Sequence, residues 1–467
     1  MPVSPARAVA YDILLKIEQE EAYASELLHA PRYARLSAAD HGLATELVMG
    51  VLRWRSALDQ QITPCSAQRL EKLDLEVLTA LRLAAYQLGF LERVPARAAV
   101  HESVELVKRA RKRSAVPFVN AVLRKLAGRT AVAKAASPKN SADTSLRRCS
   151  TQKQAGAGTS DTDRTAAAEL SEFYAHPQWL VERWCSQFGI EAAENICRFN
   201  QSVPVTAIRL CDASAEADLQ KEGVGLLPGS LLASARRVGL GDVTKTRAFA
   251  NGRIAIQDEA SQLVALLAGR GSSILDCCAA PGGKTAILAE RNPGAMILAA
   301  ELYPHRARRL RKLVPAANVR VIAADARQLP VNAQFDRVLA DVPCSGTGTL
   351  ARHPEIKWRL RPADLADLQS RQLAILQAAM AQLAPGGRLV YSTCSLEREE
   401  NSEVVEKALA ACESFRLLAC RPELERLQEE GELVWRDRDS LVDGPFFRTI
   451  PGIVPCDGFF AAILEKA

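Results

Sequence analysis

The stretch that decides the fold reads "SSILDCCAAPGGKTAILAE" and covers residues 272–290. A short apolar run ends at Asp276, a glycine pair follows, and a helical pattern then begins. The Gly-Lys-Thr ending at 283–285 is typical of a nucleoside triphosphate loop, but Cys278 stands where that loop requires its first glycine. Adjacent glycines let a backbone approach a ligand just before a helix N-terminus. The stretch therefore predicts a strand, a ligand-binding turn and a helix.

Four more apolar runs of strand length follow this stretch, and helical patterns alternate with them. The runs are "AMILAAEL" (295–302), "VRVIAAD" (319–325), "FDRVLADVP" (335–343) and "RLVYSTCS" (388–395). Strands that alternate with helices predict an α/β fold with a doubly wound, mostly parallel, Rossmann-like sheet. Such a sheet binds ligands at the carboxyl ends of its strands.

Those strand ends carry acids and thiols. The second run ends at Glu301, where a carboxylate suits the hydroxyls of a ribose, and the third ends at Asp325, which suits an adenine amino group. The fourth carries Asp341 and Cys344, and the fifth carries Cys394. Each residue alone has a structural alternative, because a terminal acid often caps the next helix and a cysteine often packs in a core. Together they predict a nucleoside-bearing cofactor that is not a triphosphate.

The rest of the chain divides into three regions. Residues 1–130 place apolar side chains at helical spacing and predict an all-helical domain. Residues 131–168 are rich in Ala, Ser, Thr and Gly, which predicts a flexible linker. Residues 169–265 predict a small α+β bridging subdomain, so the sheet domain covers 266–467.

Bulk composition permits an RNA partner and sets the expected surroundings. The 467-residue chain has a formal net charge of +6, and its 12 cysteines lack the spacing of a zinc site. We see no secretory signal and no apolar run long enough to cross a membrane. We therefore expect a cytoplasmic protein, acting as a monomer, with reduced thiols, no membrane association and no metal.

Several segments carry the resemblance to a known family. "CCAAPGGKT", "ADVPCSGTGTLARHPEIKW", "LVYSTCSLEREEN" and "DGFFAAILEK" resemble the RsmB family of 16S ribosomal RNA cytosine-C5 methyltransferases in order and spacing. The helical segments "MGVLRWR" and "VPARAAVHESVELVK" resemble the NusB-like RNA-binding domain that precedes the sheet in that family. The resemblance implies S-adenosylmethionine as cofactor and RNA as substrate. The strand-two acid is usually Asp in this family and is Glu301 here.

The resemblance also implies roles for the thiols and the cofactor loop. Cys394 is implied as the nucleophile that attacks C6 of cytosine, and Cys344 as the thiol that assists product release. Sequence alone does not rank the two thiols, because DNA cytosine methyltransferases attack with the cysteine of a Pro-Cys motif. Asp341 is placed to hydrogen-bond the cytosine ring. The expected cofactor-binding residues are Cys278, Ala279, Ala280, Pro281, Gly282, Gly283, Lys284, Glu301, Asp325 and Asp341.

Two basic segments are candidates for RNA contact. The "ARHPEIKWR" segment offers Arg352, Lys357, Trp358 and Arg359, a basic run with an aromatic that suits phosphates and base stacking. A surface loop with a half-buried tryptophan is its structural alternative. The "KRARKR" segment offers either a phosphate patch or a solvated helix end whose cations suit the helix dipole. Its cations are Lys108, Arg109, Arg111, Lys112 and Arg113.

Competing functions remain at this point. A transfer-RNA cytosine-C5 methyltransferase shares most motifs and is separated mainly by the NusB-like region. A non-catalytic RNA-binding factor would use the helical domain alone, and a P-loop ATPase is disfavoured by Cys278.

Overall fold

The computed structural model describes residues 3–20, 22–33, 36–136, 161–212 and 214–467. They fold as two compact units. The helical unit is Met1–Gln201 together with Arg352–Trp358, and the sheet unit is Ser202–Ala351 together with Arg359–Ala467. The chain therefore enters the helical unit a second time, inside a segment that reads as part of the sheet domain.

The helical unit confirms the all-helical prediction for the first 130 residues. Apolar side chains such as Ile13, Leu47 and Leu81 are fully buried and form one core. Helix α4 is buried almost all round because the other helices surround it. The helices are α1 (Pro5–Glu20), α2 (Ala24–Leu28), α3 (Ala38–Ile62), α4 (Leu75–Phe90), α5 (Ala96–Arg109), α6 (Val116–Ala136), α7 (Asp161–Phe173), α8 (Gln178–Phe188) and α9 (Ile190–Gln201).

The expected boundaries need correction at two places. Helices α6 and α7 extend into the expected 131–168 linker, and residues 137–160 of that linker lie outside the described residues. The expected bridging subdomain 169–265 is not one unit. Helices α8 and α9 belong to the helical unit, and α12 packs in the core of the large sheet. Helical periodicity locates these helices but does not show which core covers their apolar faces.

A four-stranded antiparallel sheet opens the sheet unit, with strand order β2-β3-β1-β4. One face packs Ile208, Leu219 and Ile254 into a small separate core. Its elements are β1 (Ala207–Leu210), α10 (Ala215–Lys221), β2 (Gly225–Pro228), β3 (Ala235–Leu240), α11 (Arg247–Ala250) and β4 (Ile254–Ile256).

The large sheet has nine strands, in the order β11-β12-β13-β9-β8-β5-β6-β7, with β10 beside β13. Strands β5 to β9 pair in parallel and carry all five predicted strands. Strands β10 to β13 add an antiparallel end that the sequence analysis did not predict. The strands are β5 (Ser273–Asp276), β6 (Met296–Glu301), β7 (Val319–Ala323), β8 (Phe335–Asp341), β9 (Leu383–Thr393), β10 (Phe415–Leu418), β11 (Val442–Asp443), β12 (Phe446–Thr449) and β13 (Phe459–Lys466).

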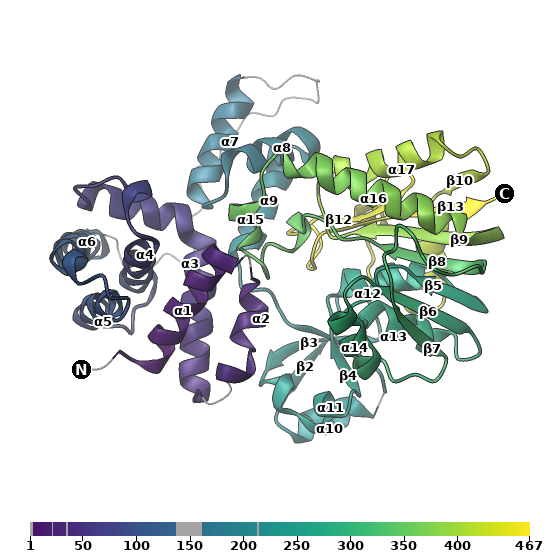
Figure 1. The fold of residues 1–467 in the computed structure, drawn as a ribbon, viewed down its shortest axis with the longest axis horizontal. Coiled ribbons are helices and arrows are strands. Elements are labelled where there is room, and N and C mark those ends of the chain that lie inside the picture. The colour runs from purple at the N-terminus through teal and green to yellow at the C-terminus, as the bar shows by residue number, and fades with distance from the viewer. Residues whose placement is uncertain (1–2, 21, 34–35, 137–160, 213) are drawn as a thin grey trace. The chain divides into compact units, whose positions relative to one another are not determined.

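Helices cover both faces of this sheet, as a doubly wound fold requires (Figure 1). Buried side chains of α12, α13, α14 and α18 form the core on one face, and those of α16 and α17 form the core on the other. No helix of the described residues is long and apolar enough to cross a membrane. The bounds are α12 (Glu259–Leu267), α13 (Gly283–Arg291), α14 (Pro304–Leu313), α16 (Asp364–Ala381), α17 (Ser402–Ala410) and α18 (Arg421–Glu429).

Candidate active site

The two predicted thiols meet at the carboxyl edge of the large sheet. Strands β8 and β9 are parallel neighbours with Asp341 opposite Ser392, so their following loops lie side by side. The Sγ atoms of Cys344 and Cys394 are 3.3 Å apart, and both residues are half-buried free cysteines. The thiols therefore share one site.

Their environment distinguishes the two thiols. The hydrogen bond with Cys394, followed by burial, raises the pKa of the Cys344 thiol well above its usual value. Either sulfur can be the donor in this hydrogen bond. A thiolate is the nucleophilic form of cysteine, and the raised pKa disfavours that form at Cys344.

Asp341 lies beside the thiols and is oriented from two sides. Its Oδ2 accepts a hydrogen bond from Lys284 Nζ at 2.7 Å, and its Oδ1 accepts one from Ser392 Oγ at 2.8 Å. Lys284 Nζ also lies 5.1 Å from the centre of the Phe459 ring. Asp341 therefore links the lysine of the glycine turn to the end of strand β8, three residues before Cys344.

A buried carboxylate, Glu400, ties the two thiol loops together. It is fully buried and accepts hydrogen bonds at 2.8 Å from the Ser345 backbone N–H and from Gln372 Nε2. The hydroxyls of Ser345 and Ser395 also donate to it. Because these serines directly follow the two cysteines, Glu400 fixes the spacing of the thiols. The sequence analysis missed this role, although Glu400 stands in the quoted "STCSLEREEN".

A crossing of backbones closes the base of the site. The N–H of Gly348 donates to Cys394 O at 2.9 Å, and the N–H of Gly458 donates to Gly348 O at 2.7 Å. A Cβ atom on Gly348 would lie 2.1 Å from Gly458 O. Only glycine fits at this crossing.

The glycine turn before α13 forms a cradle of backbone groups. The turn is tied to both neighbouring strands, because Cys277 N–H donates to Leu339 O and Ala279 N–H donates to Ala300 O, each at 2.9 Å. Gly282 has a φ of 116°, and a Cβ there would lie 2.7 Å from two apolar side chains of α14 and the residue after it. Gly282 is therefore required for the turn to pack closely against α14, and the turn leads directly into the N-terminus of α13, where backbone N–H groups suit a ligand.

Asp276 is a cofactor candidate that the sequence analysis did not assign. It ends β5, is 1% exposed, and burial raises its pKa to about 7. Thr285 Oγ1 donates to its Oδ2 at 2.7 Å and the nearby Cys278 N–H opposes the rise in its pKa, whereas its Oδ1 meets no donor at full hydrogen-bond geometry among the described residues. An orphaned buried carboxylate oxygen fits a donor supplied by a ligand. The sequence feature that could have identified Asp276 is the same as for Glu301 and Asp341: an acidic residue at the end of an apolar run of strand length.

The two remaining acids differ in availability. Glu301 is 5% exposed, accepts a hydrogen bond from the Tyr303 N–H at 3.1 Å, and lies at the end of β6 beside the turn. Asp325 is instead paired with Arg327, whose guanidinium lowers its pKa. A ligand that needs the Asp325 carboxylate must compete with this arginine.

The structure gives the "ARHPEIKWR" segment a different role from the expected one. Lys357 is 1% exposed, and its Nζ donates to the backbone oxygens of Ala175 at 2.7 Å and Arg53 at 3.0 Å. Trp358 Nε1 donates to Leu52 O at 2.6 Å. Lys357 is therefore an internal clasp of the helical unit and is not available to a phosphate. Arg352 and Arg359 flank the clasp and are half-buried.

Glu355 anchors the same segment to the helical unit. It is 1% exposed and accepts a hydrogen bond from the Ala24 N–H at 2.9 Å. We call residues 352–358 the clasp segment from here on.

The "KRARKR" segment is largely neutralised within the helical unit. Lys108 pairs with Glu105, Arg109 with Asp12, and Lys112 with Asp74 and Glu76. Arg111 and Arg113 are exposed and have no ion pair among the described residues. An RNA contact from this segment therefore rests on these two arginines.

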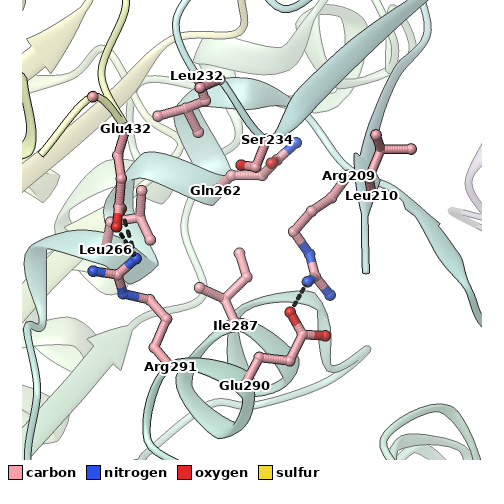
Figure 2. Close-up of a pocket in the computed structure, with 12 residues that line it drawn as sticks. Arg209, Leu210, Leu232, Ser234, Gln262, Leu266, Ile287, Glu290, Arg291 and Glu432 are labelled. Atoms are coloured by element: carbon pink, nitrogen blue, oxygen red, sulfur yellow. Dashed lines mark hydrogen bonds and ion pairs between the residues drawn. The ribbon is translucent and has the colours of Figure 1, made fainter. Parts of the chain in front are cut away.

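A separate cavity of about 260 Å³ lies between the small sheet and helices α12 and α13 (Figure 2). Arg209 pairs with Glu290 and Arg291 pairs with Glu432 on its wall. No residue of the thiol site or the glycine turn lines it among the described residues. The paired charges cancel, so this cavity is not the candidate active site.

The fold is a Rossmann-like doubly wound sheet, a fold that a solved methyltransferase homologue shares. Solved structures support the fold: the crystal structure of PH0851 aligns over 100% of both chains with a TM-score of 0.77 at 22% identity. A methyltransferase homologue from Pyrococcus horikoshii aligns over 66% of this chain and 100% of its own, with a TM-score of 0.53 at 25% identity.

Sequence comparison then identifies the family. The model for the 16S rRNA methyltransferase RsmB/F matches residues 264–465, and that for the NusB family matches residues 4–128. A probable ribosomal RNA small subunit methyltransferase B of Bacillus subtilis is 33% identical over 100% of both chains. The ribosomal RNA small subunit methyltransferase B of Vibrio cholerae is 31% identical over 91% of this chain and 90% of its own. The chain belongs to the RsmB/F family of ribosomal RNA methyltransferases, with a NusB-like helical region.

Proposed function

We propose that the chain methylates C5 of a cytosine in 16S ribosomal RNA, using S-adenosylmethionine, through a covalent bond between Cys394 and C6. The observation that carries the proposal is the 3.3 Å approach of the Cys344 and Cys394 sulfurs beside Asp341. We take the acting form to be a cytoplasmic monomer, and its partner to be this RNA, free or in an assembling small subunit.

The residues around the glycine turn fit the cofactor. The orphaned Oδ1 of Asp276 suits its ammonium group, and Glu301 suits its ribose hydroxyls. When bound, S-adenosylmethionine supplies an electrophilic methyl group next to the thiols.

The thiols divide the chemistry between them. Addition of the Cys394 thiolate to C6 forms a C–S bond and moves an electron pair toward C5, which becomes nucleophilic. Asp341, held by Lys284 and Ser392, is positioned to accept a hydrogen bond from the exocyclic amine of cytosine and so to orient the ring toward the thiols.

Product release reverses the addition. Once C5 carries the methyl group, a solvent water takes the C5 proton as base; the electron pair of that C–H bond restores the C5–C6 double bond, and the C6–S bond breaks to release the Cys394 sulfur as a thiolate. The protonated thiol of Cys344, 3.3 Å away, donates a hydrogen bond to the departing sulfur and stabilises its charge. In this mechanism Cys394 attacks the ring and Cys344 assists the release of the product.

The test is methyl transfer from labelled S-adenosylmethionine to 16S ribosomal RNA isolated from cells that lack the gene, with bisulfite sequencing to locate the product. The wild type should protect one cytosine. Methylation of transfer RNA alone would reassign the substrate. RNA binding without methyl transfer would support a non-catalytic factor instead.

A further inference from the structure

Helix α14 concentrates positive charge on its outer surface. Ala307 and Leu310 form its buried face against the large sheet. The opposite face repeats at i, i+3, i+4 and i+7, the spacing of one helix side. That face carries His305, Arg308, Arg309 and Lys312, with Arg306 and Arg311 on its flanks, and all six are exposed.

Most of these clustered cations have no ion-pair partner among the described residues. Arg306 lies 3.7 Å from Glu301, but Arg308, Arg309, Arg311 and Lys312 make no ion pair within the described residues. Some other arginines at the surface of the sheet unit do pair with a nearby carboxylate, whereas Arg247, Arg320 and Arg436 are exposed singly and also have no ion pair among the described residues. Examples of the paired arginines are Arg371 with Asp367, Arg421 with Asp439 and Arg438 with Glu425.

Clustering of this kind opposes helix stability. Arg308 and Lys312 are four residues apart, and Arg309 and Lys312 are three apart, so like charges face each other along the outer surface. No local contact offsets this repulsion among the described residues. An external polyanion would do so.

The helix begins at the ligand edge of the sheet. It starts three residues after Glu301, at the carboxyl end of β6, and its outer face extends about 10 Å along the axis. Tyr303, half exposed, lies at its start with its ring 5.8 Å from that of His305. Cations in a row beside an exposed aromatic match the chemistry of a single RNA strand, with phosphates along the helix and a base on the ring.

We propose that the outer face of α14 binds the phosphate backbone of the substrate RNA, so that RNA contact is not confined to the NusB-like helical unit. This inference rests on the proposed function for the identity of the RNA. It adds a binding surface on the sheet unit, outside both basic segments singled out from the sequence.

The experiment compares two triple variants of the full chain. R308Q/R309Q/K312Q removes three unpaired cations from α14, and R371Q/R421Q/R438Q removes three ion-paired cations from elsewhere on the sheet unit. Binding of a fluorescent 16S ribosomal RNA fragment is measured by anisotropy from 0.1 to 1 M KCl. Each lost phosphate contact lowers the slope of log affinity against log salt by about 0.7 on a single strand.

We expect the slope for the α14 variant to be smaller than that of the wild type by about two. The loss of affinity relative to the wild type should therefore be roughly 100-fold greater at 0.1 M salt than at 1 M. The control variant should keep the wild-type slope. Calorimetry should show unchanged affinity for S-adenosylmethionine in both variants, which verifies that the site edge is intact.

The outcomes separate this inference from the proposed function. Equal salt slopes in the two variants would overturn the inference even if the wild type methylates the RNA. A selective loss of slope in the α14 variant would sustain it even if labelled methyl groups never reach the RNA. Selective loss of binding to an acidic protein rather than RNA would also overturn it.

Discussion

The loop 341–349 and the clasp segment 352–358 are neighbours in one continuous motif, yet they serve different units. The first carries Asp341 and Cys344 at the edge of the large sheet. The second buries Glu355 and Lys357 among the helices. The difference teaches that residues in one sequence motif need not share one role, because burial depends on which core the backbone enters.

The largest expected effect is on methyl transfer at the thiol site. Replacing Cys394 by Ala removes the proposed nucleophile, so methyl transfer should fall by at least about 10³-fold. The free energy of unfolding should change by less than about 1 kcal/mol, since the side chain is half-buried and small. Scintillation counting of labelled RNA and urea denaturation measure the two quantities. Cys185→Ala, another half-buried thiol, is the control.

Full activity in Cys394→Ala would remove the covalent mechanism. If Cys344→Ala alone abolished activity, the roles of the two thiols would be exchanged.

Substitutions in the clasp segment should lower the free energy of unfolding rather than change the chemistry of the thiol site. Lys357→Ala removes a buried stem and two hydrogen bonds to backbone oxygens, which should cost about 2–4 kcal/mol of unfolding free energy. Lys357→Met keeps the volume and should cost less. Urea denaturation gives these values, and Lys221→Ala, at an exposed lysine, is the matched control. Unchanged stability together with weaker RNA binding would restore the RNA-contact interpretation.

The affinity for S-adenosylmethionine should depend on pH through Asp276. Asp276 must be ionised to pair with the ammonium group of S-adenosylmethionine, and its pKa is about 7. Below that pH the carboxyl is neutral, so affinity should rise with pH through about 7 and then level off. Asp276→Asn should bind about tenfold more weakly at pH 8 and show no such rise. Calorimetry across pH 6 to 8.5 checks this, and a parallel rise in the variant would exclude Asp276 as the titrating group.

The stability of the helical unit should also depend on pH, through a buried histidine rather than a carboxylate. His176 is buried and neutral: its Nδ1–H donates to Tyr174 O at 2.7 Å and its Nε2 accepts from Asn200 Nδ2 at 3.3 Å. Burial, aided by Lys357, lowers its pKa, so the unfolded chain takes up the proton first. Stability should therefore fall as pH drops below about 6.5, by at most about 1.4 kcal/mol per pH unit for this group.

Burial also lowers the pKa of His353, in the clasp segment, to about 4, which adds to this fall in the same direction. Hydrogen exchange in α8 and α9 between pH 7.5 and 5 reports on the helical unit alone. His176→Gln should flatten the response, and an unaltered response would exclude His176 as its source.

The strand ends were predictable because their signal is local. An apolar run followed by Glu301, Asp341 or Cys394 places a polar group at one edge of a parallel sheet, whatever the rest of the chain does. Asp276 carried the same signal and was overlooked.

The remainder depended on contacts distant in sequence. Nothing near Lys357 indicates burial, because its partners Arg53 and Ala175 lie more than 180 residues earlier in the chain. The antiparallel strands β10 to β13 are short or polar-flanked, and their pairing with β9 is set by register across the sheet. The expected domain boundaries differ from the two units for a similar reason, because a helical pattern does not show which core the helix packs against.

The clasp segment limits how this protein can be divided. A chain beginning at Ser202 would keep residues 352–358 but lose every helix that buries them. It would expose Trp358 and Pro354 to water a few residues beyond the thiol loop, inviting aggregation. The sheet unit is therefore not a detachable module, and fusions or swaps that replace the first 201 residues must provide a new apolar surface to bury residues 352–358.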